Sequence, residues 1–204
     1  LALSFKNHKG IILSITLGCL LHLPAAFCAA LSYGLILLVG TFFSVSLDYK
    51  RHLIVYLILC PFILGLAYFS VKREASIGSM VTYAEAKRMP EFDNKKGRFR
   101  FIPFKSPVEE AGRAVAKMVY RSPAKIDATF YCIGYLTVIL ALLIIQFVKK
   151  MELLPRDLWL VLLGISISYC AARIFAFQLY LPARYLLWPL HLFTYVAVPV
   201  AVWN

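Results

Sequence analysis

The sequence predicts an all-α protein, a polytopic transmembrane helix bundle of about six spans with one extramembrane loop subdomain. Of its 204 residues, 61% are hydrophobic and only 16% are charged, whereas about 25% of the residues in an average soluble domain are charged. The charges are also segregated, because long apolar runs contain none while residues 72–125 contain most of them. Both observations are typical of integral membrane proteins.

The first 71 residues predict three spans, at 11–25, 27–46 and 53–71. Residues 11–46 form a run of 36 residues without a formal charge. One helix of that length would measure about 54 Å, far beyond a hydrocarbon layer of roughly 30 Å. Two spans joined near residues 22–25 (His-Leu-Pro-Ala) fit this layer, and one kinked helix or a re-entrant segment is the alternative.

Residues 72–125 are the predicted extramembrane loop, a mixture of short helix and extended segments. Its clearest element is an amphipathic helix at 107–121. Ser106 is a favourable cap, Pro107 suits the first helical position, and Glu109 lies three residues after the cap. This helix could lie in the lipid headgroup layer or pack on the rest of the loop, and the sequence supports both.

The C-terminal part predicts three further spans, at 126–148, 158–178 and 185–203. Asp157 can cap the second of these helices. Trp159, Trp188 and Trp203 each fall near the end of a span, where membrane proteins concentrate tryptophan. All five cysteines lie inside apolar runs without metal-ligand spacing, so we expect them to be packing residues.

The distribution of basic residues predicts how the chain is oriented. The short loops around 50–51 and 149–156 are basic, which favours the cytoplasmic side for them and the extracytoplasmic side for the 72–125 loop. The net charge of +7 of that loop favours the opposite orientation, but long loops cross the membrane with less regard for charge than short ones. We expect a multi-pass protein of a bacterial inner (plasma) membrane, and a C-terminal fragment of a longer chain because the first residue is Leu. The formal charge of +12 is assigned to loops beside the membrane and not to nucleic-acid binding.

A polar and aromatic stripe follows one face of the last predicted span. Arg184, Trp188, His191 and Tyr195 stand at helical spacing i, i+4, i+7 and i+11. The guanidinium of Arg184 offers a planar donor fork that suits phosphate, although an ordinary interfacial anchor is the alternative. For His191 the alternative is a hydrogen-bonded residue between packed helices.

Arg173 is the other cation inside an apolar run. It could extend to the headgroups, or it could face a buried anion. The predicted site for an anion or a lipid phosphate consists of Arg173, Arg184, Tyr185, Trp188 and His191.

The sequence does not single out a catalytic base, a metal site or a cofactor. The acidic candidates on the side of the long loop are Glu74, Glu85, Glu91, Asp93, Glu109, Glu110 and Asp127. No pair of carboxylates lies inside a span, which argues against a transporter that relays protons or sodium ions.

Two stretches resemble a group of large, uncharacterised bacterial polytopic membrane proteins. Residues 89–92 (Met-Pro-Glu-Phe) and 97–99 (Gly-Arg-Phe) resemble a P-E-F…G-R-x-F loop, and residues 179–185 resemble an L-P-x-R-Y link that follows it after two spans. The loop motif comprises Pro90, Glu91, Phe92, Gly97, Arg98 and Phe99.

Residues 184–189 (Arg-Tyr-Leu-Leu-Trp-Pro) are also similar to late spans of GT-C membrane glycosyltransferases. That resemblance implies a lipid-phosphate-linked sugar donor, with Arg184 near its phosphate and the acidic residues of catalysis in an early loop outside this chain. The leading hypothesis is therefore a GT-C-like glycosyltransferase or a lipid-linked-sugar handling protein that binds an anionic lipid headgroup near Arg184. The alternative is a non-enzymatic membrane scaffold whose 72–125 loop docks a protein partner.

Overall fold

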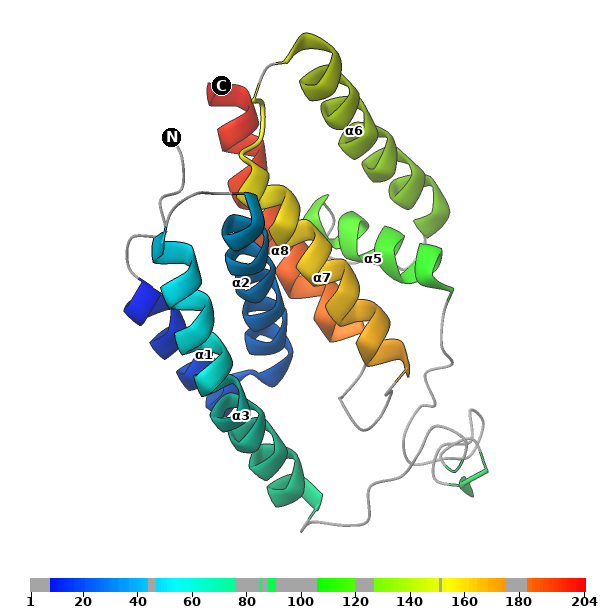
Figure 1. The fold of residues 1–204 in the computed structure, drawn as a ribbon. Coiled ribbons are helices and arrows are strands. Elements are labelled where there is room, and N and C mark those ends of the chain that lie inside the picture. The colour runs from blue at the N-terminus through cyan, green and yellow to red at the C-terminus, as the bar shows by residue number, and fades with distance from the viewer. Residues whose placement is uncertain are drawn as a thin grey trace.

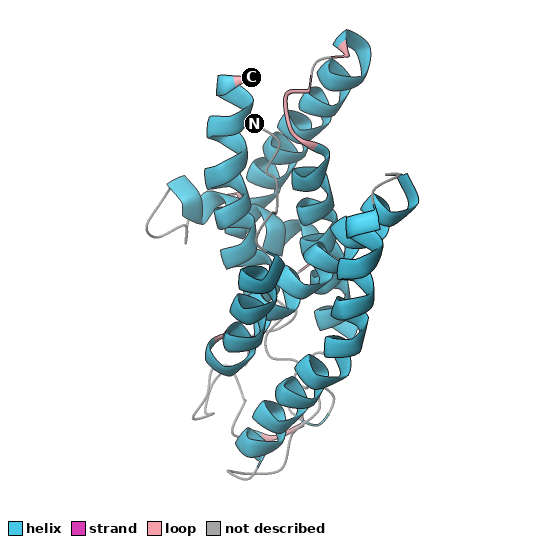
Figure 2. Ribbon diagram, turned by 60° about the vertical axis from the view of Figure 1, so that its left-hand side comes forward, coloured by secondary structure: helices cyan, strands magenta, loops and turns pink. Residues whose placement is uncertain are grey.

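The computed structural model describes residues 8–43, 47–75, 85, 88–90, 106–119, 127–150, 152–174 and 183–204. In these ranges the chain forms helices joined by turns and contains no strand (Figure 2), so the predicted all-α class is confirmed there. The helices are α1 (His8–Leu21), α2 (Leu23–Phe43), α3 (Leu47–Ala75), α5 (Pro107–Val119), α6 (Ala128–Lys149), α7 (Arg156–Ile174) and α8 (Ala183–Trp203).

Four of the helices are long and apolar enough to cross a membrane. They are Pro24–Phe43, Ala128–Lys149, Arg156–Ile174 and Ala183–Trp203. The protein is therefore a membrane protein with a helical bundle. The 14 residues of α1 would measure only about 21 Å, less than a typical hydrocarbon layer.

The long uncharged run at 11–46 is divided into two helices that fold back on each other. The break falls at His22, whose Nδ1 accepts a hydrogen bond from the backbone N–H of Ala25 at 3.2 Å. A Cβ atom on Gly18 of α1 would lie 3.2 Å from the Cβ of Ala26 in α2. The two helices therefore pack closely from the turn onward. The break lies within the joint expected near residues 22–25, although α1 ends at Leu21, before the bound of 25 expected for the first span.

The bundle is built around α2. This helix packs against α1 and α3 on one side and against α7 and α8 on the other. Figure 1 shows the start of α2 and the ends of α3 and α7 at the same end of the molecule, together with the start of α8. Two further helices, α5 and α6, lie beyond α7 and α8.

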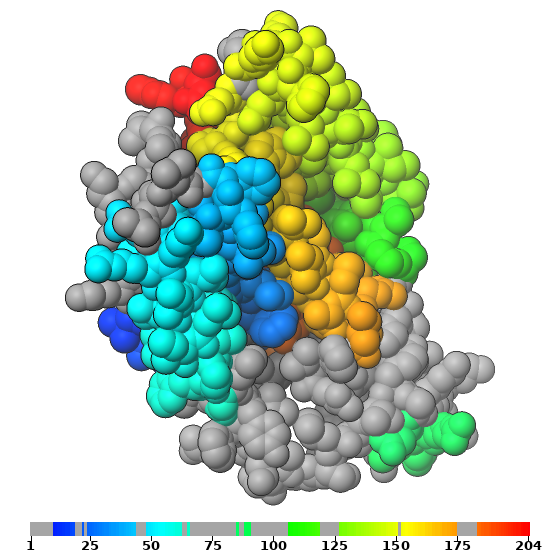
Figure 3. Space-filling model, viewed as in Figure 1, coloured from blue at the N-terminus to red at the C-terminus, as the bar shows by residue number. Residues whose placement is uncertain are grey.

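The helices α2 and α7 cross closely, and Figure 3 shows them meeting along a seam. At its centre, a Cβ atom on Gly164 would lie 2.7 Å from the Cα atom of Ser32. The hydroxyl of Ser32 donates to the carbonyl of Val161 at 3.3 Å. Small residues and a hydroxyl that crosses between helices are the features that hold helices together in lipid.

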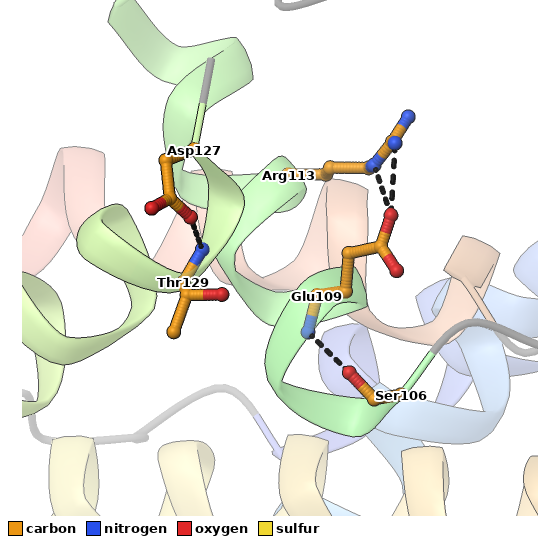
Figure 4. Close-up of polar contacts among 5 residues, drawn as sticks. All are labelled: Ser106, Glu109, Arg113, Asp127 and Thr129. Atoms are coloured by element: carbon orange, nitrogen blue, oxygen red, sulfur yellow. Dashed lines mark hydrogen bonds and ion pairs between the residues drawn. The ribbon is translucent and has the colours of Figure 1, made fainter.

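The caps of α5 and α6 lie near each other (Figure 4). The hydroxyl of Ser106 accepts from the backbone N–H of Glu109 at 3.1 Å, so the expected cap of α5 is confirmed. Asp127 caps α6 by accepting from the backbone N–H of Thr129 at 2.9 Å. By contrast, Asp157 does not precede its helix, because α7 already begins at Arg156.

The structure shows a contact of α5 that neither expectation for it named. Among the described helices, it packs against α6 and α8. Ala114 and Ala116 are buried, and Ala111, Val115 and Met118 join the same hydrophobic core as α7 and α8. The side chains of Arg113 and Lys117 are exposed. The helix is thus buried over most of its circumference, because its small residues let two neighbours approach.

Candidate functional site

Arg184 and Trp188 occupy the start of α8, near the end of α7. Arg184 is the second residue of the helix and is exposed, and Trp188 is 56% exposed one turn later. A helix N-terminus carries partial positive charge and free backbone N–H groups, so an arginine here adds to a local field that favours an anion. Both side chains can reach a molecule outside the bundle.

The predicted stripe on α8 is formed by rings in contact. The ring centroids of Trp188 and His191 are 6.2 Å apart, and those of His191 and Tyr195 are 6.4 Å apart, both at steep interplanar angles. Trp188 and Tyr195 are exposed, while His191 between them is partly buried. The stripe therefore presents two amphipathic rings outward from a fixed central residue.

His191 is fixed by α5. Its Nε2 lies 2.7 Å from the carbonyl oxygen of Ala114. A carbonyl can only accept, so Nε2 carries the proton and donates. The structure thus places His191 as the hydrogen-bonded residue between packed helices, which was the alternative to a ligand role.

Arg173 is held by a carboxylate of the protein itself. Its Nη1 lies 3.1 Å from the Oε2 atom of Glu110 on α5 and donates to the Tyr169 hydroxyl at 3.1 Å. The Tyr169 hydroxyl in turn donates to the same oxygen of Glu110. The guanidinium also lies over the Tyr169 ring, 5.9 Å from its centroid. Of the two possibilities for Arg173, the structure shows the buried anion.

Glu110, Tyr169 and Arg173 form a cluster that we call the α5–α7 clamp. The side chain of Glu110 is 9% exposed and that of Arg173 is 26% exposed. One oxygen of Glu110 accepts from both a phenol and a guanidinium, which leaves it poorly suited to remove a proton from a substrate. The clamp's evident chemical effect is to fix the first turn of α5 to the end of α7.

Tyr185 lies on a different face of α8 from the stripe. It is fully buried, with its ring 6.0 Å from that of Phe27 in an edge-to-face arrangement. The thiol of Cys28 donates to the Tyr185 carbonyl at 3.5 Å. Because Pro189 has no N–H, that carbonyl lacks its normal partner within α8. Cys28 therefore supplies the donor that the proline removes, a role beyond the packing expected for it.

Replacing Cys28 with alanine is expected to lower the free energy of unfolding by about 1 kcal/mol, because the carbonyl freed by Pro189 loses its donor. Cys28→Ser keeps a donor and should retain most of the stability. Unfolding of the purified protein in mixed detergent micelles measures both. Cys132→Ala is the control, because it removes a thiol that is also buried. Equal losses in Cys28→Ala and Cys132→Ala would show that only packing matters.

The structure thus gives different roles to the five residues predicted for the anion site. Arg184 and Trp188 are exposed, His191 contacts α5, Arg173 belongs to the clamp and Tyr185 packs on α2. Of the loop motif, Pro90 is exposed. Glu91, Phe92, Gly97, Arg98 and Phe99 lie outside the described residues, as do residues 179–182 of the link.

The described ranges contain no group of three His, Cys, Asp or Glu side chains that could hold a metal ion. Comparison of the chain with protein-family models, curated proteins and solved structures finds no match.

Proposed function

We propose that the protein binds the anionic, phosphate-bearing headgroup of a membrane lipid at the start of α8. The observation that carries this proposal is the exposed Arg184 next to the exposed ring of Trp188. Arginine donates two parallel hydrogen bonds to phosphate oxygens, and tryptophan is favoured at the depth where headgroups meet hydrocarbon. Arg173 is left out of the proposed site, because Glu110 already neutralises it.

The proposed class is a lipid-linked-sugar handling protein of the GT-C glycosyltransferase type. Its support is the likeness of residues 184–189 to late spans of those enzymes, together with the position of Arg184 at a helix end. In this proposal the chain holds the lipid phosphate of the sugar donor, and acidic residues outside the chain perform the transfer.

We place the protein in a bacterial inner membrane with about six spans, in which α1 and α3 supplement the four long apolar helices. The short α1, about 21 Å long, would cross where the bilayer thins locally. The support for α3 is its uncharged stretch at 53–71. The loop at 72–125 would then lie on the extracytoplasmic side, which is also the side of Arg184, because α6 and α7 cross the membrane between them.

Replacing Arg184 with alanine is expected to weaken binding of phosphatidic acid by about tenfold or more, because a charge-assisted hydrogen bond to phosphate is lost. The measurement is native mass spectrometry of the protein in phosphatidylcholine nanodiscs that contain graded amounts of phosphatidic acid. Arg184→Lys should retain part of the affinity, since it keeps the charge but not the fork.

Arg113→Ala is the matched control. Arg113 is an exposed arginine whose guanidinium pairs with Glu109 at 2.8 Å on α5. Its replacement should leave phosphatidic acid binding unchanged. Binding that is undiminished in Arg184→Ala, or equally reduced in Arg113→Ala, would contradict the proposed site.

A further inference from the structure

An apolar cavity of about 370 Å³ lies among α1, α2, α7 and α8. Its floor is formed by α2 and α7, which meet at Ser32 and Val161. Ile11 of α1 lines one side, and Leu192 and Val196 of α8 line the other. We call this cavity the α8 groove.

The α8 groove is open to the outside of the bundle. Leu192 is 64% exposed and Val196 is 45% exposed, and Ala29 on the floor is also exposed. These residues lie well inside helices that are long enough to span a membrane. The medium at that depth is lipid hydrocarbon, so a lipid chain is the molecule that can reach the groove.

The chemistry of the lining also suits a hydrocarbon chain. The Ser32 hydroxyl and the Cys28 thiol both line the groove, and both already donate to backbone carbonyls. The other lining residues are apolar apart from the hydroxyl of Tyr33. A cavity with such walls has few partners for water, and if it stayed empty its lining would lose dispersion contacts.

The groove lies on the Tyr185 side of α8, and the groove residue nearest the proposed headgroup site is Leu192, which stands one helical turn after Trp188. Pro189, at its near end, follows Arg184 by five residues, and Val196, at its far end, follows Arg184 by twelve. Along a helix these separations correspond to about 7.5 Å and about 18 Å. An apolar groove roughly 10 Å long therefore begins beyond Arg184 along the axis of α8, turned around the helix from the arginine and adjoining Trp188 through Leu192.

We infer that the α8 groove holds one hydrocarbon chain of the lipid whose phosphate Arg184 binds. This inference rests on the proposed function and extends it from a headgroup site to a site for a whole amphiphile. Charge complementarity selects the anionic head, and the shape of the groove fixes the chain that follows it.

The test uses a photoactivatable phosphatidic acid with a diazirine halfway along one acyl chain, in phosphatidylcholine nanodiscs that contain the protein. Adducts are located by peptide mass spectrometry. We expect them to be several-fold more frequent on the α2 and α8 residues of the groove than on the exposed face of α6 at Leu136, Leu140 and Phe147. A phosphatidylcholine probe should show no such preference, and Arg184→Ala should abolish it.

Ala29→Trp would fill the groove and is expected to reduce the groove adducts about fivefold, because the chain loses several carbon contacts. Val196→Trp fills it from the other wall and serves if Ala29→Trp does not fold. Leu140→Trp adds the same side chain to the exposed face of α6 and should change nothing.

Binding of dihexanoyl phosphatidic acid separates this inference from the proposed function. Its chains are too short to fill the groove, so its binding should be weakened by Arg184→Ala but not by Ala29→Trp. Adducts that are equally frequent on the groove and on α6 would overturn the groove inference, even if Arg184 still bound the short-chain lipid. A bifunctional crosslinker that joined the groove to a second copy of the protein would also overturn the inference. If Arg184→Ala did not weaken binding of this short-chain lipid, the proposed function itself would be overturned.

Discussion

Replacing Gly112 with alanine is expected to separate α5 from α6 and to lower the free energy of unfolding by about 3 kcal/mol. A Cβ atom at this position would collide with the carbonyl group of Ala128, the first residue of α6. The obstacle is backbone within a capped helical turn, so no side-chain rotation can relieve it. Either the two helices move apart or α5 rotates out of the core that Ala114 shares with α7 and α8.

Gly134→Ala is the matched control for this prediction. Gly134 lies in α6 as well, but a Cβ atom there would meet no atom within 4 Å. The methyl group should be neutral or slightly stabilising, because alanine favours a helix over glycine. Unfolding of both variants in mixed micelles, followed by tryptophan fluorescence, measures the difference. Equal stability of the two variants would contradict the close approach of α5 to α6.

Breaking the α5–α7 clamp is the second change with a large expected effect. Glu110→Leu leaves the Arg173 guanidinium partly buried without a counter-charge, and we expect it to destabilise the protein by about 2–3 kcal/mol. Arg173→Met should lower the free energy of unfolding by a similar amount, because the buried Glu110 carboxylate loses its counter-charge. The double variant should recover most of the loss, since both charges are then replaced by apolar groups. A double-mutant cycle in micelles measures the coupling.

The exposed pair of Glu109 and Arg113 provides the comparison for the clamp. It has a shorter distance, 2.8 Å against 3.1 Å, yet its side chains are 37% and 44% exposed. Such i, i+4 pairs contribute only about 0.3–0.5 kcal/mol. The cycle of Glu109→Leu with Arg113→Met should therefore show little coupling. If Glu110 and Arg173 coupled no more strongly than Glu109 and Arg113, burial would not be the cause of the clamp's contribution to stability.

Local features of the chain could be predicted from the sequence because their causes are local. Ser106 caps α5 through an N–H group three residues away, and Asp127 caps α6 through one two residues away. The break near His22 follows from length, because no single helix of 36 residues fits a bilayer of ordinary thickness. The membrane character follows from composition alone.

The clamp could not be predicted, because its members come from distant parts of the chain. Glu110 and Arg173 are separated by 63 residues, and Glu110 was one of seven acidic candidates with equivalent surroundings in the sequence. The spacing within α5 favours Glu109 as a salt-bridge partner on the same helix and says nothing about α7. A weak signal was available in Arg173 itself, because a cation in an apolar run needs an anion within reach.

The packing of α5 against α6 and α8 could not be predicted from the sequence, for a different reason. Its apolar face is compatible with lipid headgroups, with other loop residues and with helices, because amphipathicity shows only that one face avoids water. The informative residues are Ala111, Gly112, Ala114 and Ala116, whose small size permits close packing against a neighbour. That signal identifies an interface but not the helix on the other side, which depends on the tertiary arrangement.

The placement of α5 has a consequence for how the protein is assembled. Its core face is completed by α8, through the hydrogen bond from His191 and through the shared hydrophobic cluster. Because α6 and α7 separate α5 from α8 in the chain, the ribosome completes α5 before α8 exists. Until α8 is made, the part of α5 that α8 covers stays exposed, while α6 can already pack against the helix. A chain halted before α8 would therefore leave apolar residues of α5, Ala111 and Ala114 among them, without the cover that α8 provides.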